Sequence, residues 1–442
     1  MRVVIGIDLG STTTKAIVLD EDGRVLGRGI TNSRSNYDVA CAVARNEALI
    51  DSRFNLFRSR AAFESVAAGA RDGIMQRLEL GFRREQYSGQ LDDLQAACTE
   101  HLTGPRFSKV RDAAQGVLES SFATLRSETR ALFSETGARR SNFFRDLAGS
   151  RLLEIMEPCC RERSVPFDLM MGLYDKSIIG VENHVPEVTF ESNVMCAMGD
   201  ALEGGSLDDI RSAALRAQLE DVARETLTEA CVVGTGYGRA RLPFPRENIR
   251  SEILCHGLGA HAMFPETRTV LDIGGQDTKA IQVDADGIVE SFQMNDRCAA
   301  GCGRYLGYIA DEMNMGVQDL GPMALRAKTP VKINSTCTVF AGAELRDRLA
   351  IGQRREDILG GLHRAMILRA MSLLARSGGI RDEFTFTGGV ANNEAAVKAL
   401  ECLVQENYGE RHLNISPDSI YTGALGAALF ARRHAEGEKE VA

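Results

Sequence analysis

Two stretches of the chain repeat one pattern without a gap. Residues 7–26 read IDLGSTTTKAIVLDEDGRVL and residues 271–290 read LDIGGQDTKAIQVDADGIVE, with ten of twenty positions identical. Each copy has an apolar run ending in Asp, a turn of small polar residues, a lysine, a second β-branched run and an Asp-x-Asp-Gly turn. This order is typical of a β-hairpin and the start of another. The repeat predicts two related lobes.

The first turn of each copy has the composition of a phosphate-binding loop. Glycine lets backbone N–H groups come close to an anion, and the Ser and Thr hydroxyls of residues 11–14 add donors. Asp8 and Asp272 end the apolar runs, where a carboxylate can hold Mg²⁺ or its waters against phosphates. Two ordinary hairpins with polar turns are the alternative. Turn chemistry alone does not require Asp, Gly, Thr and Lys to recur together, so the repeat favours phosphate loops.

Both loops resemble the phosphate motifs of the actin, Hsp70 and sugar-kinase superfamily, whose members are two-lobed ATPases. A third segment, residues 383–393 (EFTFTGGVANN), resembles the adenosine motif of that superfamily. The resemblance implies an α/β class and a duplicated two-lobed ATPase fold that binds ATP and Mg²⁺. It assigns catalysis and Mg²⁺ to Asp8 and Asp272. It assigns the nucleotide to Gly10, Ser11, Thr12, Thr13, Lys15, Gly274, Gly275, Gln276, Asp277, Lys279, Gly388, Gly389 and Asn392. By position alone, Gln276 and Asp277 are also candidates for the side chain that orients the attacking water.

Composition and charge limit the classes of partner that the chain can bind. The formal net charge of the 442 residues is −9 at pH 7, with no evident basic patch, which argues against nucleic acid as a partner. The chain opens on an apolar strand pattern at residues 2–7, and we expect no apolar run to reach the length of a membrane span. We therefore expect a cytoplasmic protein that does not contact membranes.

Two of the eleven cysteines stand apart from the rest. The odd number and scattered positions argue against disulfides. Cys298 (NDRCAAG) and Cys337 (STCTVFA) each lie just before a helical pattern, where the helix dipole stabilises a thiolate and makes it a candidate ligand. Two thiolates do not complete a four-cysteine iron–sulfur site. A symmetric partner chain that supplies two more would complete it.

The two cysteine segments resemble the cluster-binding segments of the activator ATPases of 2-hydroxyacyl-CoA dehydratases and benzoyl-CoA reductases. In that family one [4Fe-4S] cluster bridges two ATPase chains, so the resemblance implies that Cys298 and Cys337 are cluster ligands. Residues 234–239 and 252–259 also fit the family's lobe connection. Cys302 lies where the family has a small residue, and we expect it to be a bystander. We expect Cys255 and His256 to be core residues.

The resemblance covers residues 1–32 and about 215–433, leaving a long insertion between them. Its Phe, Leu and Arg residues interleave in a mostly helical pattern, while Pro, Gly and Asp in residues 165–205 predict loops or a small strand-containing cap. We expect a first lobe at 1–32 and 217–266, an insertion at 33–216 and a second lobe with the cluster ligands at 267–442. The insertion either packs on its own lobe or docks another subunit, and its many arginines favour docking.

The insertion also favours one branch of the family, the larger ATPase subunit of ATP-dependent benzoyl-CoA reductases. This resemblance implies a shorter homologous ATPase subunit that shares the cluster, two reductase subunits that bind benzoyl-CoA, and ferredoxin as electron donor. The expected function is to couple ATP hydrolysis to low-potential electron transfer in anaerobic degradation of aromatic compounds. The alternatives are the homodimeric activator of a 2-hydroxyacyl-CoA dehydratase, and a sugar-kinase-like phosphotransferase or chaperone-like switch without redox function.

Overall fold

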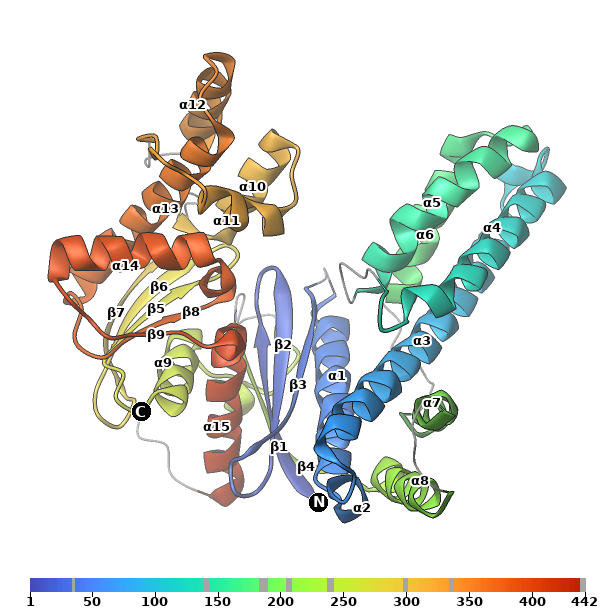
Figure 1. Ribbon diagram of the computed structural model, residues 1–442, viewed down its shortest axis with the longest axis horizontal. Helices are drawn as coiled ribbons and strands as arrows, with labels where there is room; N and C mark the ends of the chain where they lie inside the picture. Colours follow the sequence, from blue (N-terminus) through green and yellow to red (C-terminus); the bar gives the residue numbers. More distant parts are fainter. Residues whose placement is uncertain are drawn as a thin grey trace. The chain divides into compact units, whose positions relative to one another are not determined.

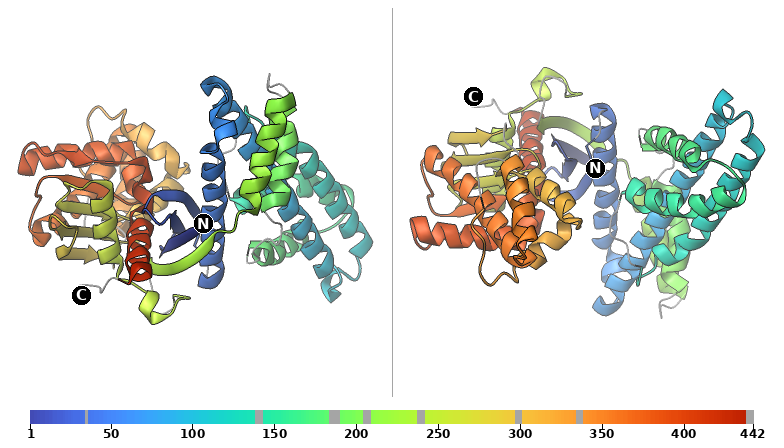
Figure 2. Two further views of the ribbon diagram at one scale, coloured as in Figure 1. Left: turned by 90° about the horizontal axis from the view of Figure 1, so that it is seen from below. Right: turned by 90° about the horizontal axis from the view of Figure 1, so that it is seen from above.

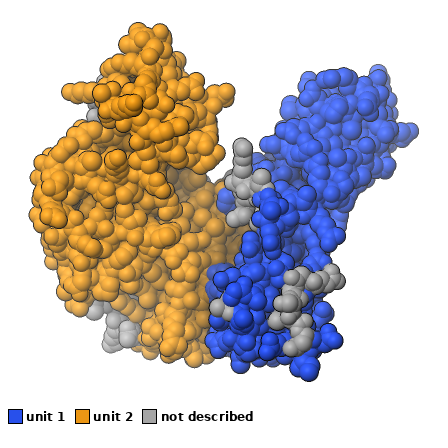
Figure 3. All heavy atoms as spheres, in the orientation of Figure 1, with its two compact units in different colours: residues 1, 50–227 blue, residues 2–49, 228–442 orange. Residues whose placement is uncertain are grey.

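The computed structural model describes residues 1–33, 36–137, 143–182, 190–203, 209–236, 242–296, 301–333 and 338–437. The chain divides into two compact units, coloured separately in Figure 3. Residues 2–49 and 228–442 form the sheet unit, and residues 1 and 50–227 form the helical unit. The lobe and insertion bounds expected from the sequence stay a prediction.

The sheet unit contains two sheets of the same design (Figure 1). In each sheet the first strand is antiparallel to the next strand along the chain and parallel to a strand from much later in the sequence. The first sheet has the order β3-β2-β1-β4, with β1 at Arg2–Leu9, β2 at Thr13–Leu19, β3 at Val25–Asn32 and β4 at Thr228–Gly236. The second has the order β7-β6-β5-β8-β9, with β5 at Thr269–Ile273, β6 at Thr278–Val283, β7 at Val289–Asn295, β8 at Phe384–Thr387 and β9 at Leu413–Asn414.

The sequence repeat has the same register in both sheets. Asp8 on β1 pairs with Lys15 on β2, and Asp272 on β5 pairs with Lys279 on β6. The glycine of each Asp-x-Asp-Gly turn has a positive φ, 83° in the first copy and 78° in the second, which glycine adopts without steric cost. The predicted duplication and α/β class are confirmed.

Helices cover both sheets of the sheet unit. Two run beside the strands, α9 at Glu252–Met263 and α15 at Thr422–Glu436, while α1 at Tyr37–Arg58 begins in the sheet unit and ends in the helical unit. The others in the sheet unit are α10 at Gly303–Met313, α11 at Val317–Ala324, α12 at Thr338–Ala350, α13 at Arg355–Ser377 and α14 at Glu394–Tyr408.

Among the helices that the structure describes, only α13 has the length and composition of a membrane span. From the sequence we expected no apolar segment of this length, and that expectation was wrong for α13. Of the apolar stretch in α13, 67% is buried, and the helix packs in the core of the second sheet. That burial is typical of a core helix.

The first sheet is completed by the helix that follows the second sheet in the chain. Figures 1 and 2 show α15 alongside β1, and the two meet at glycine: a Cβ on Gly6 would lie 2.1 Å from Ala428 N and 2.2 Å from Ala424 O. Because both contacts are with backbone atoms, a side chain at Gly6 forces α15 away from the sheet.

We predict that Gly6→Ala destabilises the sheet unit by about 2–4 kcal/mol, because overpacking against backbone displaces a whole helix. Urea unfolding followed by circular dichroism measures the change. Gly307→Ala is the control, since nothing lies within 4 Å of a Cβ at this position in α10. That control is expected to be neutral or slightly stabilising, as alanine favours helix over glycine. Equal stability of the two variants contradicts the packing argument.

The helical unit is built around its own core. Tyr87 on the longest helix lies 5.3 Å and 5.6 Å, centroid to centroid, from Phe133 and Phe144. A second aromatic group joins Phe54, Phe82 and Phe190 at 5.3–5.4 Å. The helices are α2 at Ala61–Glu64, α3 at Ala68–His101, α4 at Arg111–Leu132, α5 at Phe144–Glu162, α6 at Phe167–Glu182, α7 at Phe190–Glu203 and α8 at Asp209–Arg224.

The expectation of loops or strands in residues 165–205 was wrong. The described part of this segment is mostly the helices α6 and α7. In α6 the buried side chains Met170, Leu173, Ile178 and Val181 recur at helical spacing, a pattern that its glycines and aspartates obscured in the sequence. The mostly helical character expected of the insertion is confirmed.

Candidate functional site

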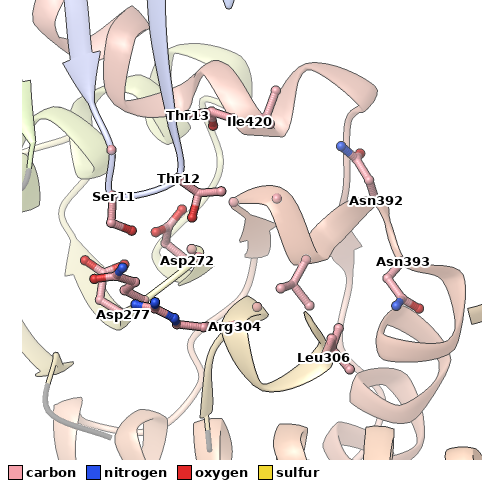
Figure 4. Close-up of a pocket in the computed structure, with 18 of the residues that line it drawn as sticks. Ser11, Thr12, Thr13, Asp272, Asp277, Arg304, Leu306, Asn392, Asn393 and Ile420 are labelled. Carbon is pink, nitrogen blue, oxygen red and sulfur yellow. The ribbon is translucent and has the colours of Figure 1, made fainter. Parts of the chain in front are cut away.

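A cavity of about 930 Å³ in the sheet unit collects the motifs (Figure 4). The structure brings the three nucleotide motifs to one place, while the roles of their side chains stay predictions. The two predicted cluster ligands, Cys298 and Cys337, lie outside the described residues. The lining includes every residue that the sequence predicts for the nucleotide or for Mg²⁺: Asp8, Gly10, Ser11, Thr12, Thr13, Lys15, Asp272, Gly274, Gly275, Gln276, Asp277, Lys279, Gly388, Gly389 and Asn392.

The two phosphate loops approach each other across the cavity. A Cβ on Gly275 would lie 2.1 Å from Thr12 Oγ1, so the lack of a side chain at Gly275 lets the second loop lie close to the first. The first loop is braced from behind by Ser33, whose hydroxyl donates a hydrogen bond of 2.5 Å to Gly10 O. Close loops with exposed amides and hydroxyls can grip a phosphate chain from both sides.

Asp272 is buried at the centre of a polar cluster. Its Oδ1 accepts a hydrogen bond of 2.9 Å from Thr387 Oγ1 and lies 3.2 Å from His256 Nδ1, within ion-pair distance but outside hydrogen-bond geometry. Its Oδ2 lies 3.3 Å from Lys279 Nζ. Burial alone would raise the pKa of Asp272, but the charges of His256 and Lys279 lower it on balance. Asp272 is therefore ionised at neutral pH and can serve as a hard oxygen ligand.

The two repeated lysines have different surroundings. Lys279 Nζ is enclosed by Asp277 at 2.9 Å, Asp272 at 3.3 Å and Glu252 at 3.3 Å, and the residue is 3% exposed. Burial would lower the pKa of Lys279, but the three carboxylates raise it. Lys15 Nζ has Asp8 Oδ2 at 3.8 Å. The same lysine of the repeat is thus locked in one loop and loosely held in the other.

Helix α9 contributes two residues to the site that were not assigned to it from the sequence. Glu252 and His256 both line the cavity and are 7% exposed. Burial raises the pKa of Glu252; for His256 burial lowers the pKa, but the nearby Asp272 raises it on balance. Cys255 belongs to the core, as expected, whereas His256, which was also expected in the core, lines the cavity. The signal in the sequence was two polar residues four apart, on one face of an apolar helix.

The far end of the cavity has the character of a nucleoside site. Gly388 follows β8 with φ 86°, and a Cβ there would lie 2.4 Å from Ile273 O, so the diglycine turn lies directly on β5. Asn393 caps α14, its Oδ1 accepting from the amides of residues 395 and 396, and its Nδ2 lies 3.1 Å from His363 Nε2. The apolar lining suits a base: Leu306, Val317, Pro322 and Val390.

The second phosphate loop is tied to the start of α10. The backbone N–H of Gly303 donates to Gly274 O at 2.8 Å, and that of Arg304 donates to Gly275 O at 2.7 Å. The Thr278 hydroxyl donates to the carbonyl of residue 301. Cys302, directly before α10, is fully buried. A displacement of the loop therefore moves the beginning of α10 with it.

The cavity fits ATP with Mg²⁺. Its volume is in the range of small-molecule sites, its two loops face each other, and its carboxylates are the ligand type that Mg²⁺ prefers. For iron, the described residues contain no group of three or more His, Cys, Asp or Glu side chains able to hold a metal. The two predicted cluster ligands are outside the described residues, so the fit of a cluster rests on the sequence.

Two facing phosphate loops, a diglycine nucleoside turn and duplicated sheets define an ATPase with the actin and sugar-kinase fold. The chain belongs to the BadF/BadG/BcrA/BcrD ATPase family, whose model matches residues 5–431. Members of this family bind ATP.

Relatives by sequence include two kinds of protein. The chain is 41% identical to the (R)-2-hydroxyglutaryl-CoA dehydratase activating ATPase of Acidaminococcus fermentans, over 49% of this chain and 81% of that protein. It is 34% identical to a benzoyl-CoA reductase subunit of Thauera aromatica, over 51% of this chain and 80% of that protein. The crystal structure of Acidaminococcus fermentans (R)-2-hydroxyglutaryl-CoA dehydratase component A superposes with a TM-score of 0.55 at 22% identity, covering 99% of this chain and 100% of that one, and it supports the fold.

Proposed function

We propose that this chain is an activator ATPase that couples ATP hydrolysis to electron delivery, through a [4Fe-4S] cluster shared with a second ATPase chain, to an enzyme acting on an acyl-CoA. The observation that carries the proposal is the link between the nucleotide cavity and α10, through the amides of Gly303 and Arg304. Activation of a 2-hydroxyacyl-CoA dehydratase is the better supported form, because identity to a dehydratase activator is 41% against 34% for the reductase relative.

A second form is the electron-activating ATPase subunit of a benzoyl-CoA reductase. The long insertion that forms the helical unit supports it, because its sequence resembles the larger ATPase subunit of such reductases. The two relatives align with similar shares of this chain, 49% and 51%, so the alignments do not separate the two forms. In this form the helical unit docks a reductase subunit, the cluster is shared with a shorter ATPase subunit, and ferredoxin supplies the electrons. In either form the protein works in the cytoplasm. A phosphotransferase has no use for Cys298 and Cys337.

In the proposed mechanism, residues of the cavity bind the nucleotide, and the change from ATP to ADP moves helix α10. The two loops would bind the phosphates and the diglycine turn would accept the adenosine. The carboxylates of Asp8 and Asp272 would hold Mg²⁺, which would neutralise phosphate charge. The second loop then pulls or releases α10 through its hydrogen bonds to Gly303 and Arg304. Cys298, just before this helix in the sequence, would hold the cluster together with Cys337, and a change in the surroundings of the cluster would tune electron transfer.

The cysteines provide a direct test. We predict that Cys298→Ser and Cys337→Ser each lose the iron and sulfide of the anaerobically purified protein. Cys302→Ser is the matched control, a buried cysteine close in sequence that is expected to keep them. Iron and sulfide are measured together with ATP turnover, which all three variants should retain. A full cluster in both of the first two variants contradicts the proposed electron transfer.

Native mass spectrometry of the complex from its own cells separates the two forms. A homodimer with one [4Fe-4S] cluster supports the dehydratase activator. A complex with a shorter homologous ATPase and two further chains supports the reductase form. An iron-free monomer overturns both and leaves an ATPase without redox function.

A further inference from the structure

We propose, on the basis of the proposed ATPase function, that Arg304 is a catalytic residue whose guanidinium binds the terminal phosphate of ATP. In the hydrolysis step a water oxygen bonds to the γ-phosphorus as the bond from that phosphorus to the β,γ-bridging oxygen breaks. The electron pair of that bond stays on ADP, and the water gives up a proton to solvent. Arg304 would offset the negative charge on the oxygens around the γ-phosphorus during this exchange.

The charges of the cavity lead to Arg304. Three described residues of the lining carry a permanent positive charge: Lys15, Lys279 and Arg304. Lys279 is already enclosed by three carboxylates, and Lys15 lies 3.8 Å from the Asp8 carboxylate. Arg304 is exposed, and its side chain forms no ion pair or hydrogen bond within the part of the chain that the structure describes. It is therefore the cation best able to take a new anionic partner.

Its position matches this role. The backbone N–H of Arg304 is hydrogen-bonded to Gly275 O at 2.7 Å, so the residue is anchored to the second phosphate loop itself. Figure 4 shows the side chain extending from α10 toward Asp277, on the side of the cavity where Ser11 and Asp272 lie and away from Asn392. The guanidinium thus reaches the phosphate end of the cavity from a fixed backbone.

The chemistry of guanidinium suits a terminal phosphate. Its planar fork of N–H donors binds two phosphate oxygens at once. Lys279 cannot replace it without leaving the carboxylates of Glu252 and Asp277 and its own contact with Asp272. The transition state spreads negative charge over the equatorial oxygens of the γ-phosphoryl group and the leaving oxygen. Because a contact that strengthens only in the transition state raises kcat, we expect Arg304 to act mainly on kcat.

Three variants of the full chain test the assignment: Arg304→Gln, Arg304→Lys and the control Arg364→Gln. Arg364 is also partly exposed, but it pairs with Glu406 and does not line the cavity. We expect Arg304→Gln to lower kcat for ATP by about 10²-fold, the usual loss for one transition-state donor. We expect Arg304→Lys to recover part of it, because lysine keeps the charge but not the fork. The control should match the wild type.

Binding without turnover gives an independent measurement. Titration calorimetry with ADP alone, and with ADP plus aluminium fluoride as a transition-state mimic, compares the wild type with Arg304→Gln. We expect ADP affinity to stay within about threefold and affinity for the mimic to fall at least about tenfold. An unchanged kcat in Arg304→Gln overturns the role of Arg304 but leaves the proposed function standing. The same holds if the variant binds ADP and the mimic more weakly by an equal factor. A wild type that neither binds nor hydrolyses ATP overturns the proposed function as well.

Discussion

Asp8→Asn is expected to lower ATP turnover by about 10³-fold while leaving the fold intact. The substitution keeps the size of the side chain but removes the charge that we assign to Mg²⁺, and a metal ion supplies several kcal/mol of stabilisation to the transition state. Asp8 is 5% exposed, and Gly423 and Gly236 leave space for its carboxylate: a Cβ at either would lie within about 3.0 Å of its oxygens. The side chain is thus held in place by β4 and α15, both of which pack against β1.

Turnover measured across a Mg²⁺ titration checks this expectation. The variant should need more Mg²⁺ and still fail to reach the wild-type rate at saturation. Asp22→Asn is the control, since Asp22 belongs to the same repeat but is largely exposed and paired with Arg24 at 3.2 Å. Wild-type turnover in Asp8→Asn rules out a metal-binding role for Asp8, and loss of the cluster with the activity would instead indicate misfolding.

Lys279→Met is expected to destabilise the sheet unit by about 3–5 kcal/mol, because it leaves buried carboxylates without their cation. The repeat supplies the matched variant, Lys15→Met. Lys15 has one described carboxylate partner, Asp8 at 3.8 Å, so its loss is expected to cost less than the loss of Lys279 and to act mainly on nucleotide affinity. Urea unfolding of both variants measures the difference. Equal destabilisation by the two substitutions contradicts the asymmetry of the repeat.

The direction in which the stability of the wild type and of Lys279→Met changes with pH follows from the pKa shifts. In the wild type the pKa of Asp272 is lowered, so its contribution to stability is present above the usual aspartate range and is lost only as the pH falls through the lowered pKa. In Lys279→Met the raised pKa of the buried Glu252 loses the charge that opposes it, so this carboxyl takes up a proton more readily in the folded state than in the unfolded one. The destabilisation should therefore shrink as the pH is lowered from 7 toward 5.

The repeat made the frame of the site predictable. Both hairpins, both phosphate loops and the positions of Asp8 and Asp272 one residue before their strand ends follow from local patterns: an apolar run, a small polar turn, a lysine and an Asp-x-Asp-Gly turn. The diglycine turn after β8 was readable for the same reason, since its glycine needs a positive φ. Local signals of this kind need no knowledge of distant residues.

Partners brought in from other elements could not be predicted in the same way. The repeat assigns the same lysine to both loops, but α9 delivers Glu252 to the second copy, and this tertiary contact changes the role of Lys279. Arg304 stands in a helical pattern with nothing in its neighbours to indicate that its backbone is bonded to Gly275. The helices of residues 165–205 were missed because turn-forming residues outweighed an amphipathic spacing.

The packing of α15 on β1 has a consequence for the order in which the protein is made. Residues 422–436 leave the ribosome last among the described elements, yet they cover a face of the strand that leaves it first among them. While translation is under way, the helical unit can fold from residues that are contiguous in the chain, whereas β1 still lacks both β4 and α15. The newborn N-terminal hairpin therefore exposes apolar surface for most of synthesis, and a chaperone that shields such strands should be found on ribosome-bound chains of this protein.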